Sequence, residues 1–392
     1  MIQILYLLFL LASTLNLIGC MPKTNDSEDS TNNSYVWKIP ISSNELAGSS
    51  FPKILVANSI ISHQWQNGIP IIVGFDKDSG KKLWQWSDTF DGREFFCKDS
   101  YLFGATLVFR DAARIYGINV KTGTTNWKNR IDVPSRGSDI SALGETIFFH
   151  GSSKYFFSAN ISTTKIQQVF TIQSSASSYL GSTEVFIAPD SRDTMLILPY
   201  SLSTRTINID STFITLFNLS KNQVHFTKLL FPPQYFAGFD YPPVFSQNRI
   251  YLAANNLILC LDAKSGQELW KEQFPAPFFS SGIIYHDGMI IGNCEDTFMY
   301  ALDANTGKQL WATKTAGTSS RLFEMNGVIY FTGGGDGLLH AVDAKTGKHI
   351  WKKESPDLQR NSGAWFFDSV TGADGKIYVS SYLSLFCYKA AR

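Results

Sequence analysis

The sequence carries little net charge. Its 34 Lys and Arg residues balance 33 Asp and Glu residues, and charged residues make up only 17% of the 392 positions. Binding to nucleic acid or to an anionic lipid surface depends on a strong positive field, and no long basic run is present here. We therefore expect no nucleic-acid partner.

The sequence also lacks the short motifs that carry most metal-dependent and hydrolytic chemistry. There is no Gly-x-Ser-x-Gly motif and no His-x-x-x-His pair. Asp76, Asp78 and Gly80 begin like a calcium loop, but Ser87 stands where the final Glu of such a loop belongs. We expect no metal site, no cofactor and no catalytic residue, and we expect surface or packing roles for six histidines: His63, His150, His225, His286, His340 and His349.

Cysteine is scarce, with five residues and no Cys-x-x-Cys. If Cys20 is a lipid-attachment site, the remaining four are Cys97, Cys260, Cys294 and Cys387. Four cysteines allow three pairings, and the sequence does not choose among them. Cys260 and Cys387 each follow an apolar residue inside a predicted strand, which favours buried free thiols.

The first nineteen residues are almost wholly apolar and predict a signal peptide. Leu17-Ile-Gly-Cys20 resembles the lipobox of bacterial lipoproteins, in which the Cys becomes the lipidated first residue. The segment departs from the usual pattern because it has no Lys or Arg. An uncleaved membrane anchor and plain cleaved secretion remain the alternatives. We predict a signal peptide at 1–19, a flexible tether at 20–34 and a folded domain at 35–392.

One sequence motif recurs through the folded domain. Asp-Ala-x-Ser/Thr-Gly-x-x-x-Trp occurs at 262–270, 303–311 and 343–351, with earlier copies at 76–84 and 119–127. Two worn copies end in Phe170 and Phe226. From Trp84 onward the closing aromatics are spaced by 43, 43, 56, 44, 41 and 40 residues. A period near forty suits the four short strands and turns of one β-propeller blade.

The residue types of the repeat have physical roles. Asp or Asn followed by Ser/Thr-Gly predicts a turn, because the Asp or Asn side chain accepts bonds from backbone N–H groups and Gly tolerates positive φ. The Trp begins the last strand of a blade and fills the space beside the next blade. Asp287-Gly288, Asn326-Gly327 and Asp374-Gly375 predict tight hairpins, and Gly335-Asp-Gly337 predicts another turn. The predicted structural repeat residues are Trp37, Trp84, Trp127, Trp270, Trp311, Trp351, Gly80, Gly123, Gly266, Gly307 and Gly347.

The two ends of the domain complement each other. After Trp351 the sequence supplies three more strands, whereas Tyr35–Ile39 is a single strand with no blade before it. Pairing that strand with the last blade closes the ring and protects strand edges. We therefore predict an all-β fold, an eight-bladed β-propeller of four-stranded blades. Seven blades is the alternative, should the region from Phe170 to Phe226 not form two blade boundaries.

The repeated sequence motif resembles the tryptophan-docking motif of the PQQ-like propeller repeat family. That family includes quinoprotein alcohol dehydrogenases and the outer-membrane assembly lipoprotein BamB. The resemblance covers nearly all of residues 35–392 and implies a fold more strongly than a function. Many of the quinoprotein enzymes place two adjacent cysteines over the quinone, and this sequence has no such pair.

Two segments depart from the repeat. The 56-residue step contains Ser174–Ser182 and Pro189–Asp193, and loops held on a rigid scaffold are common binding elements. The second segment, 231–243, holds five aromatic residues among prolines, which predicts either an exposed partner-binding patch or a packed blade-linking strand. The candidate partner-binding residues are Phe231, Tyr235, Phe236, Phe239 and Tyr241.

The family resemblance implies a non-catalytic, lipid-anchored scaffold for protein partners, BamB-like in the assembly of outer-membrane β-barrels. Met21 follows Cys20 where an Asp would disfavour delivery to the outer membrane. We expect a monomeric propeller that faces the periplasm, or alternatively the cell surface. Another ligand- or partner-binding lipoprotein, such as a sensor or adhesin, and a PQQ-dependent dehydrogenase are the alternative functions.

Overall fold

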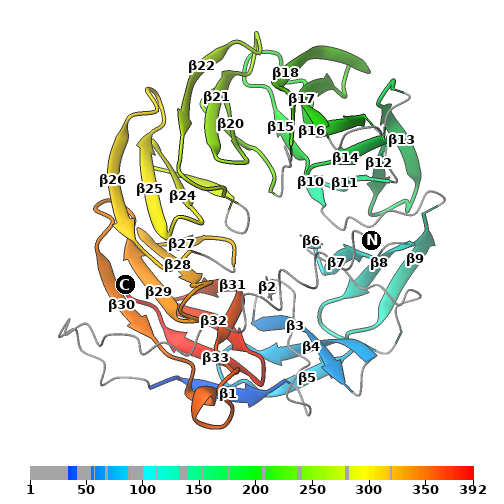
Figure 1. The fold of residues 1–392 in the computed structure, drawn as a ribbon. Coiled ribbons are helices and arrows are strands. Elements are labelled where there is room, and N and C mark those ends of the chain that lie inside the picture. Colours follow the sequence, from blue (N-terminus) through cyan, green and yellow to red (C-terminus); the bar gives the residue numbers. More distant parts are fainter. Residues whose placement is uncertain are drawn as a thin grey trace. The chain divides into compact units, whose positions relative to one another are not determined.

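Eight antiparallel sheets follow one another around a ring in the computed structural model (Figure 1). All of them belong to the unit formed by residues 33–392. The structure describes residues 34–41, 54–56, 58–66, 69–86, 88, 100–111, 113–131, 140–151, 154–174, 177–204, 209–235, 241–278, 282–317 and 320–392. Cys20, Cys97 and the predicted signal peptide lie outside the described residues.

We number the blades in chain order. Blade 1 comprises β2 (Ile54–Val56), β3 (Ser59–Gln66), β4 (Ile69–Asp76) and β5 (Lys82–Gln85). Blade 2 comprises β6 (Ser100–Phe103), β7 (Thr106–Arg110), β8 (Arg114–Asn119) and β9 (Thr125–Arg130). Blade 3 comprises β10 (Ser141–Leu143), β11 (Thr146–His150), β12 (Tyr155–Asn160) and β13 (Ile166–Thr171). Blade 4 comprises β14 (Ser177–Leu180), β15 (Glu184–Ile187), β16 (Thr194–Thr204), β17 (Ile209–Asn218) and β18 (Gln223–Tyr235).

The second half of the ring repeats this order. Blade 5 comprises β19 (Val244–Ser246), β20 (Arg249–Ala254), β21 (Leu257–Asp262) and β22 (Glu268–Gln273). Blade 6 comprises β23 (Ile283–His286), β24 (Met289–Asn293), β25 (Phe298–Asp303) and β26 (Gln309–Lys314). Blade 7 comprises β27 (Phe323–Met325), β28 (Val328–Thr332), β29 (Leu339–Asp343) and β30 (His349–Lys353). Blade 8 comprises β31 (Phe366–Ala373), β32 (Lys376–Ser381), β33 (Ser384–Lys389) and β1 (Trp37–Pro40), and the short 3-10 helix η1 (Pro356–Gln359) precedes it.

The predicted fold class, an eight-bladed all-β propeller, is confirmed. Seven blades consist of strands consecutive in sequence, and the middle strands are the most buried, as in β24 and β28. Phe170 lies in β13 and Phe226 in β18, so the worn region does contain two blade boundaries. The hairpins at Asp287-Gly288, Asn326-Gly327 and Asp374-Gly375 have positive φ at both residues, as expected for these turns.

A tryptophan of one blade packs on the turn glycine of the next. At Gly307 an added Cβ would lie 2.8 Å from Cδ2 of Trp270, so only glycine permits this approach. The Trp270 indole N–H donates to the Ala304 carbonyl at 3.0 Å. Asp303 shapes the turn by accepting bonds from the Thr306 backbone and hydroxyl, both at 2.8 Å. The hydroxyl bond holds the pKa of Asp303 below its usual value.

The same contact recurs between other blades. Glycines at 80, 123 and 347 pack against Trp37, Trp84 and Trp311 of the preceding blade. Trp37, Trp84 and Trp270 are buried, whereas Trp127, Trp311 and Trp351 are partly exposed. The repeated tryptophans thus lie between blades, although they are buried to different degrees.

The two worn copies keep the backbone geometry without the glycine. Thr164 and Asn222 occupy the turn position that glycine holds elsewhere, with φ of 58° and 51°. Asparagine visits this left-handed region readily, but a β-branched threonine does so rarely. Thr164 therefore holds local backbone strain in blade 3.

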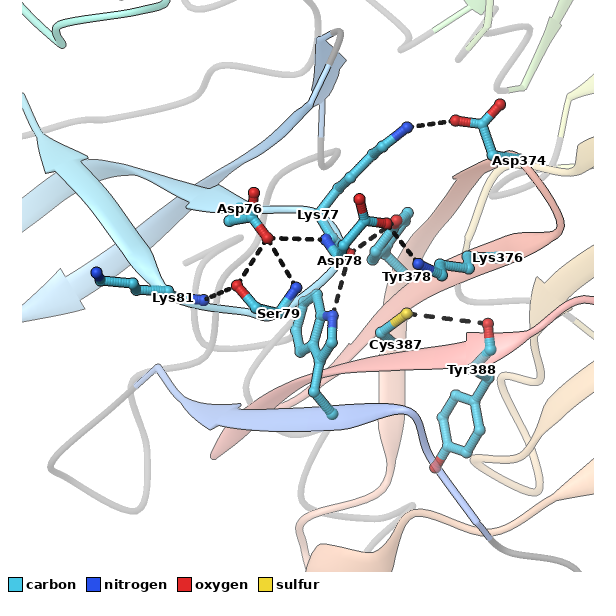
Figure 2. A network of polar contacts seen from close by, with 11 residues as sticks. Asp76, Lys77, Asp78, Ser79, Lys81, Asp374, Lys376, Tyr378, Cys387 and Tyr388 are labelled. Carbon is cyan, nitrogen blue, oxygen red and sulfur yellow. Dashed lines mark hydrogen bonds and ion pairs between the residues drawn. The ribbon is translucent and has the colours of Figure 1, made fainter.

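The ring closes through the N-terminal strand, as the sequence predicts. β1 pairs with β33, with Trp37 opposite Cys387. The Trp37 indole N–H and the Tyr378 hydroxyl both donate to the Lys77 carbonyl, at 3.0 and 3.1 Å. Two ion pairs, Lys77–Asp374 and Lys376–Asp78, also join blade 1 to blade 8 (Figure 2).

Three cysteines are buried free thiols, which confirms that interpretation for the described residues. They are Cys260, Cys294 and Cys387. Burial raises the pKa of Cys260 to about 12 and that of Cys294 to about 11. Thiols with such pKa values carry little thiolate at neutral pH, so these groups act as small apolar side chains in the core.

We predict that Trp37→Ala weakens ring closure. The change removes a buried indole and its bond to Lys77, so it should lower the free energy of unfolding by about 3–5 kcal/mol. Urea unfolding followed by circular dichroism measures the loss. Val36→Ala, at an exposed neighbour, is the control and should change little. A loss below about 1 kcal/mol for Trp37→Ala would contradict this role of the indole.

We also predict that Thr164→Gly stabilises the protein. Glycine relieves the left-handed strain but loses more chain entropy on folding, so the expected net gain is up to about 1 kcal/mol. The reciprocal change, Gly123→Thr, should destabilise because its Cβ would lie 2.4 Å from Cε3 of Trp84. Thermal unfolding of both variants tests the pair, and a lower midpoint for Thr164→Gly would show that the turn is unstrained.

Candidate functional site in the cleft between blades 4 and 5

Blade 4 departs from the other blades in its strands. β14 and β15 both pair with the same strand, β16, so two short segments share the innermost position. β16, β17 and β18 contain 11, 10 and 13 residues, whereas the strands of blade 6 contain four to six. These additions account for the 56-residue step in the repeat.

The turn between β15 and β16 is also enlarged. It runs from residue 188 to residue 193, where other blades use a two-residue turn such as Asn326-Gly327. Two backbone bonds of 2.9 Å hold it, from Ala188 N to Asp193 O and from Arg192 N to Ala188 O. The predicted loop Pro189–Asp193 is thus an ordered turn over the edge of blade 4.

This turn forms one wall of a cleft between blades 4 and 5. The cleft encloses about 460 Å³, within the range of small-molecule pockets. Its apolar part includes Met195 and Leu216 of blade 4 and Ala263 of blade 5. Phe186 of blade 4 stacks on Phe245 of blade 5, with ring centroids 3.6 Å apart. The cleft therefore has an aromatic floor contributed by both blades.

The rim of the cleft is polar. Asp193 accepts bonds from the Lys221 ammonium at 2.7 Å and the Asn218 amide at 2.9 Å, and the Lys221 contact lowers the pKa of Asp193. His225 contacts the Lys264 carbonyl at 2.7 Å. Asp190 is exposed and forms no ion pair with the described part of the chain. An apolar floor under a charged rim suits an amphipathic group such as a protein side chain.

A second, smaller cavity of about 240 Å³ lies at the inner strands of blades 4 to 7. Tyr241, Gly282, Glu184 and Arg321 line it. The Arg321 guanidinium lies 4.8 Å from the Tyr241 ring centroid, a cation–π contact. Burial raises the pKa of Glu184 to about 7. Glu184 therefore changes charge near neutral pH at the start of β15.

The structure places the predicted partner-binding aromatics in different environments. Phe231 is buried in the core between blades 4 and 5, because β18 continues through this residue and turns its ring inward. It therefore cannot belong to an exposed patch. Tyr241 is partly buried against Arg321. The side chains of Tyr235, Phe236 and Phe239 lie outside the described residues, so partner binding by these three stays a prediction.

The remaining sequence candidates have structural surroundings. Within the described ranges, no group of three or more His, Cys, Asp or Glu side chains is arranged to hold a metal ion. Asp76, the start of the calcium-loop resemblance, accepts from the Ser79 backbone and hydroxyl at 2.8 and 2.7 Å. His340 is buried, stacks on Phe331 at 4.6 Å and contacts Asp336 at 3.1 Å. The side chain of His63 lies outside the described residues.

The sequence matches the family model described as outer membrane protein assembly factor BamB over residues 29–183 and 229–392. The chain belongs to this family. The match leaves out residues 184–228, which include β15, β16, β17 and the start of β18. The unmatched segment therefore supplies the blade 4 wall of the cleft.

Solved structures share the fold at low identity. BamB from Moraxella catarrhalis is 15% identical with a TM-score of 0.60, covering 91% of this chain and 97% of that one. The quinohemoprotein alcohol dehydrogenase from Comamonas testosteroni is 10% identical with a TM-score of 0.67, covering 90% of this chain and 76% of that one. The propeller architecture is thus common to an assembly factor and to an enzyme.

A curated relative is an enzyme. Tetrathionate hydrolase of Acidithiobacillus ferrooxidans is 23% identical over 276 residues, which are 67% of this chain and 46% of that protein. The chain thus matches about half the length of this relative. Among the residues that the structure describes, none forms a helix with the length and hydropathy of a membrane span.

We predict that Glu184→Gln alters the pH dependence of stability. The pKa of Glu184 is raised on folding, so the folded protein binds an extra proton between pH 4.5 and about 7. Unfolding free energy should fall across this window as pH rises, by up to about 1.4 kcal/mol per pH unit, and the variant should lack this slope. Urea unfolding at several pH values measures the difference, and identical slopes would contradict it.

Proposed function

We propose that this protein is a lipid-anchored, non-catalytic scaffold that binds protein partners, BamB-like, in the assembly of outer-membrane β-barrels. Membership of the BamB family is the observation that carries the proposal. The structural likeness to BamB covers 91% of this chain and nearly the whole of the other. A closed ring of blades offers a rigid support on which loops of a single blade present a binding surface.

The proposed anchor is a lipid on Cys20 at the end of the predicted signal peptide. The polar segment that follows would act as a tether and hold the propeller near the periplasmic face of the outer membrane. A second candidate, a sensor or adhesin, gains support from the cleft, whose volume of about 460 Å³ suits a small ligand.

We predict that cross-linked affinity purification of the full-length lipoprotein from native membranes enriches the barrel-assembly protein. Partner binding at the aromatic segment predicts that a triple change, Tyr235→Ser with Phe236→Ser and Phe239→Ser, reduces this enrichment. Mass spectrometry of the eluted proteins measures it.

The control is Leu269→Ser, which removes an exposed apolar side chain from β22 of blade 5. It should leave enrichment unchanged. Absence of the barrel-assembly protein from an abundant, lipidated bait would contradict the proposed function. Loss of enrichment with Leu269→Ser as well would contradict only the assignment of partner binding to the aromatic segment.

A further inference from the structure

Three docking tryptophans, Trp37, Trp84 and Trp270, form a hydrogen bond as well as an apolar contact, whereas the buried indole nitrogen of Trp311 has no hydrogen-bond partner in the described part of the chain. The indole N–H of Trp84 donates to the Val120 carbonyl at 2.8 Å, and that of Trp270 donates to the Ala304 carbonyl at 3.0 Å. In both cases the acceptor immediately follows the Asn or Asp that begins the turn of the next blade. The equivalent acceptor between blades 4 and 5 is the carbonyl of Ala263.

At this junction the docking residue is a phenylalanine. Phe226 packs on Gly266, where an added Cβ would lie 2.9 Å from its ring. A phenyl ring is smaller than an indole and has no N–H, so Ala263 receives no indole bond from blade 4. Ala263 is 8% exposed, whereas its counterpart Ala304, which accepts the Trp270 indole bond, is fully buried.

The cleft lies beside this incomplete junction. Phe226 packs against the same apolar cluster as Phe186, Met195 and Leu216, which line the cleft, and Ala263 lines it from blade 5. The enlarged turn at 188–193 adds the outer wall. Two departures from the repeat, a long turn and a phenylalanine, therefore coincide at one cavity.

The charges that line the cleft favour a ligand that carries a Lys or Arg side chain. Three carboxylates line it, from Asp190, Asp193 and Asp262, against the two ammonium groups of Lys221 and Lys264. Lys221 is paired with Asp193, whereas the exposed Asp190 has no ion-pair partner within the described ranges. An incoming Lys or Arg beside Asp190 would offset the excess negative charge.

We propose that the cleft binds a tryptophan side chain of a partner polypeptide, next to a Lys or Arg in that partner. The indole packs on Phe186 and Phe245 and donates its N–H to the Ala263 carbonyl, completing in trans the contact that Phe226 leaves unmade. Tryptophan suits such a site because it buries a large apolar area and carries one donor. The inference rests on the proposed function only in that the partner is a polypeptide.

The test uses the full-length protein in detergent and dye-labelled pentapeptides, with fluorescence anisotropy as the readout. The probe is Gly-Lys-Trp-Lys-Gly, compared with a Leu-for-Trp peptide and a Glu-for-Lys peptide. We expect the Lys-Trp-Lys peptide to bind at least about tenfold more tightly than either. Equal binding of the Leu peptide would overturn the proposal. Competition by N-acetyltryptophanamide that matches the whole peptide would assign the site to a small aromatic ligand instead.

Phe226→Trp supplies the missing indole from the chain itself and should abolish peptide binding. Phe170→Trp is the matched control, because it makes the same change at the worn junction between blades 3 and 4. It should leave binding unchanged. Unchanged binding by a folded Phe226→Trp variant would overturn the proposal.

Asp190→Lys provides a second variant at an exposed position, which spares the core. It should reverse the preference between the Lys-flanked and Glu-flanked tryptophan peptides, and an unaltered preference would contradict the charge assignment. Loss of peptide specificity with retained enrichment of the barrel-assembly protein would reject this inference alone. Specific peptide binding without that enrichment would reject the proposed function alone.

Discussion

The contact between a tryptophan and the turn glycine of the next blade is the constraint on which the rest of this structure depends. Backbone pairing in the sheets joins strands of one blade, and side-chain contacts join neighbouring blades, together with single backbone bonds such as that from the Phe366 N–H to the Gly337 carbonyl at 3.0 Å. At Gly123 an added Cβ would lie 2.4 Å from Trp84, and the glycine φ of 71° disfavours any other residue. Each such junction fixes the position of one blade against the next, and Trp37 applies the same contact to close the ring.

The sequence predicts this architecture well because the contact is encoded locally. A turn beginning with Asp or Asn, a glycine four residues later and a tryptophan four residues beyond it occur together in five copies, so their spacing marks the blades that contain them. The strand at Tyr35–Ile39 predicts ring closure because it has no blade before it, whereas the last blade has only three strands of its own. The blade count and the hairpins follow from these patterns, and the positions of Cys260 and Cys387 inside predicted strands indicate their burial.

Blade 4 could not be predicted in the same detail because its copy of the repeat is worn. Asn222 replaces the glycine and Phe226 replaces the tryptophan, so the strand boundaries lose their markers. β14 and β15 then share one partner strand, which no periodicity indicates. The sequence left segment 231–243 as either an exposed patch or a packed strand, and β18, which extends to Tyr235, buries the ring of Phe231. One sequence signal could have indicated the cleft: the 56-residue step in the repeat ends at Phe226, which replaces the docking tryptophan.

Blade 4 contains the segment that the family match leaves out, residues 184–228. The family match stops at residue 183 and resumes at residue 229, so the part of the ring that matches the family supports a segment outside the match. Rigid scaffolds commonly carry binding elements in such segments. Photo-cross-linking in native membranes tests this account directly. A photoreactive residue at Gln223, on the rim of the cleft, is compared with one at Thr124, the equivalent exposed position in blade 2. The account predicts a partner adduct from Gln223 and none from Thr124, whereas equal adducts or none from Gln223 would contradict it.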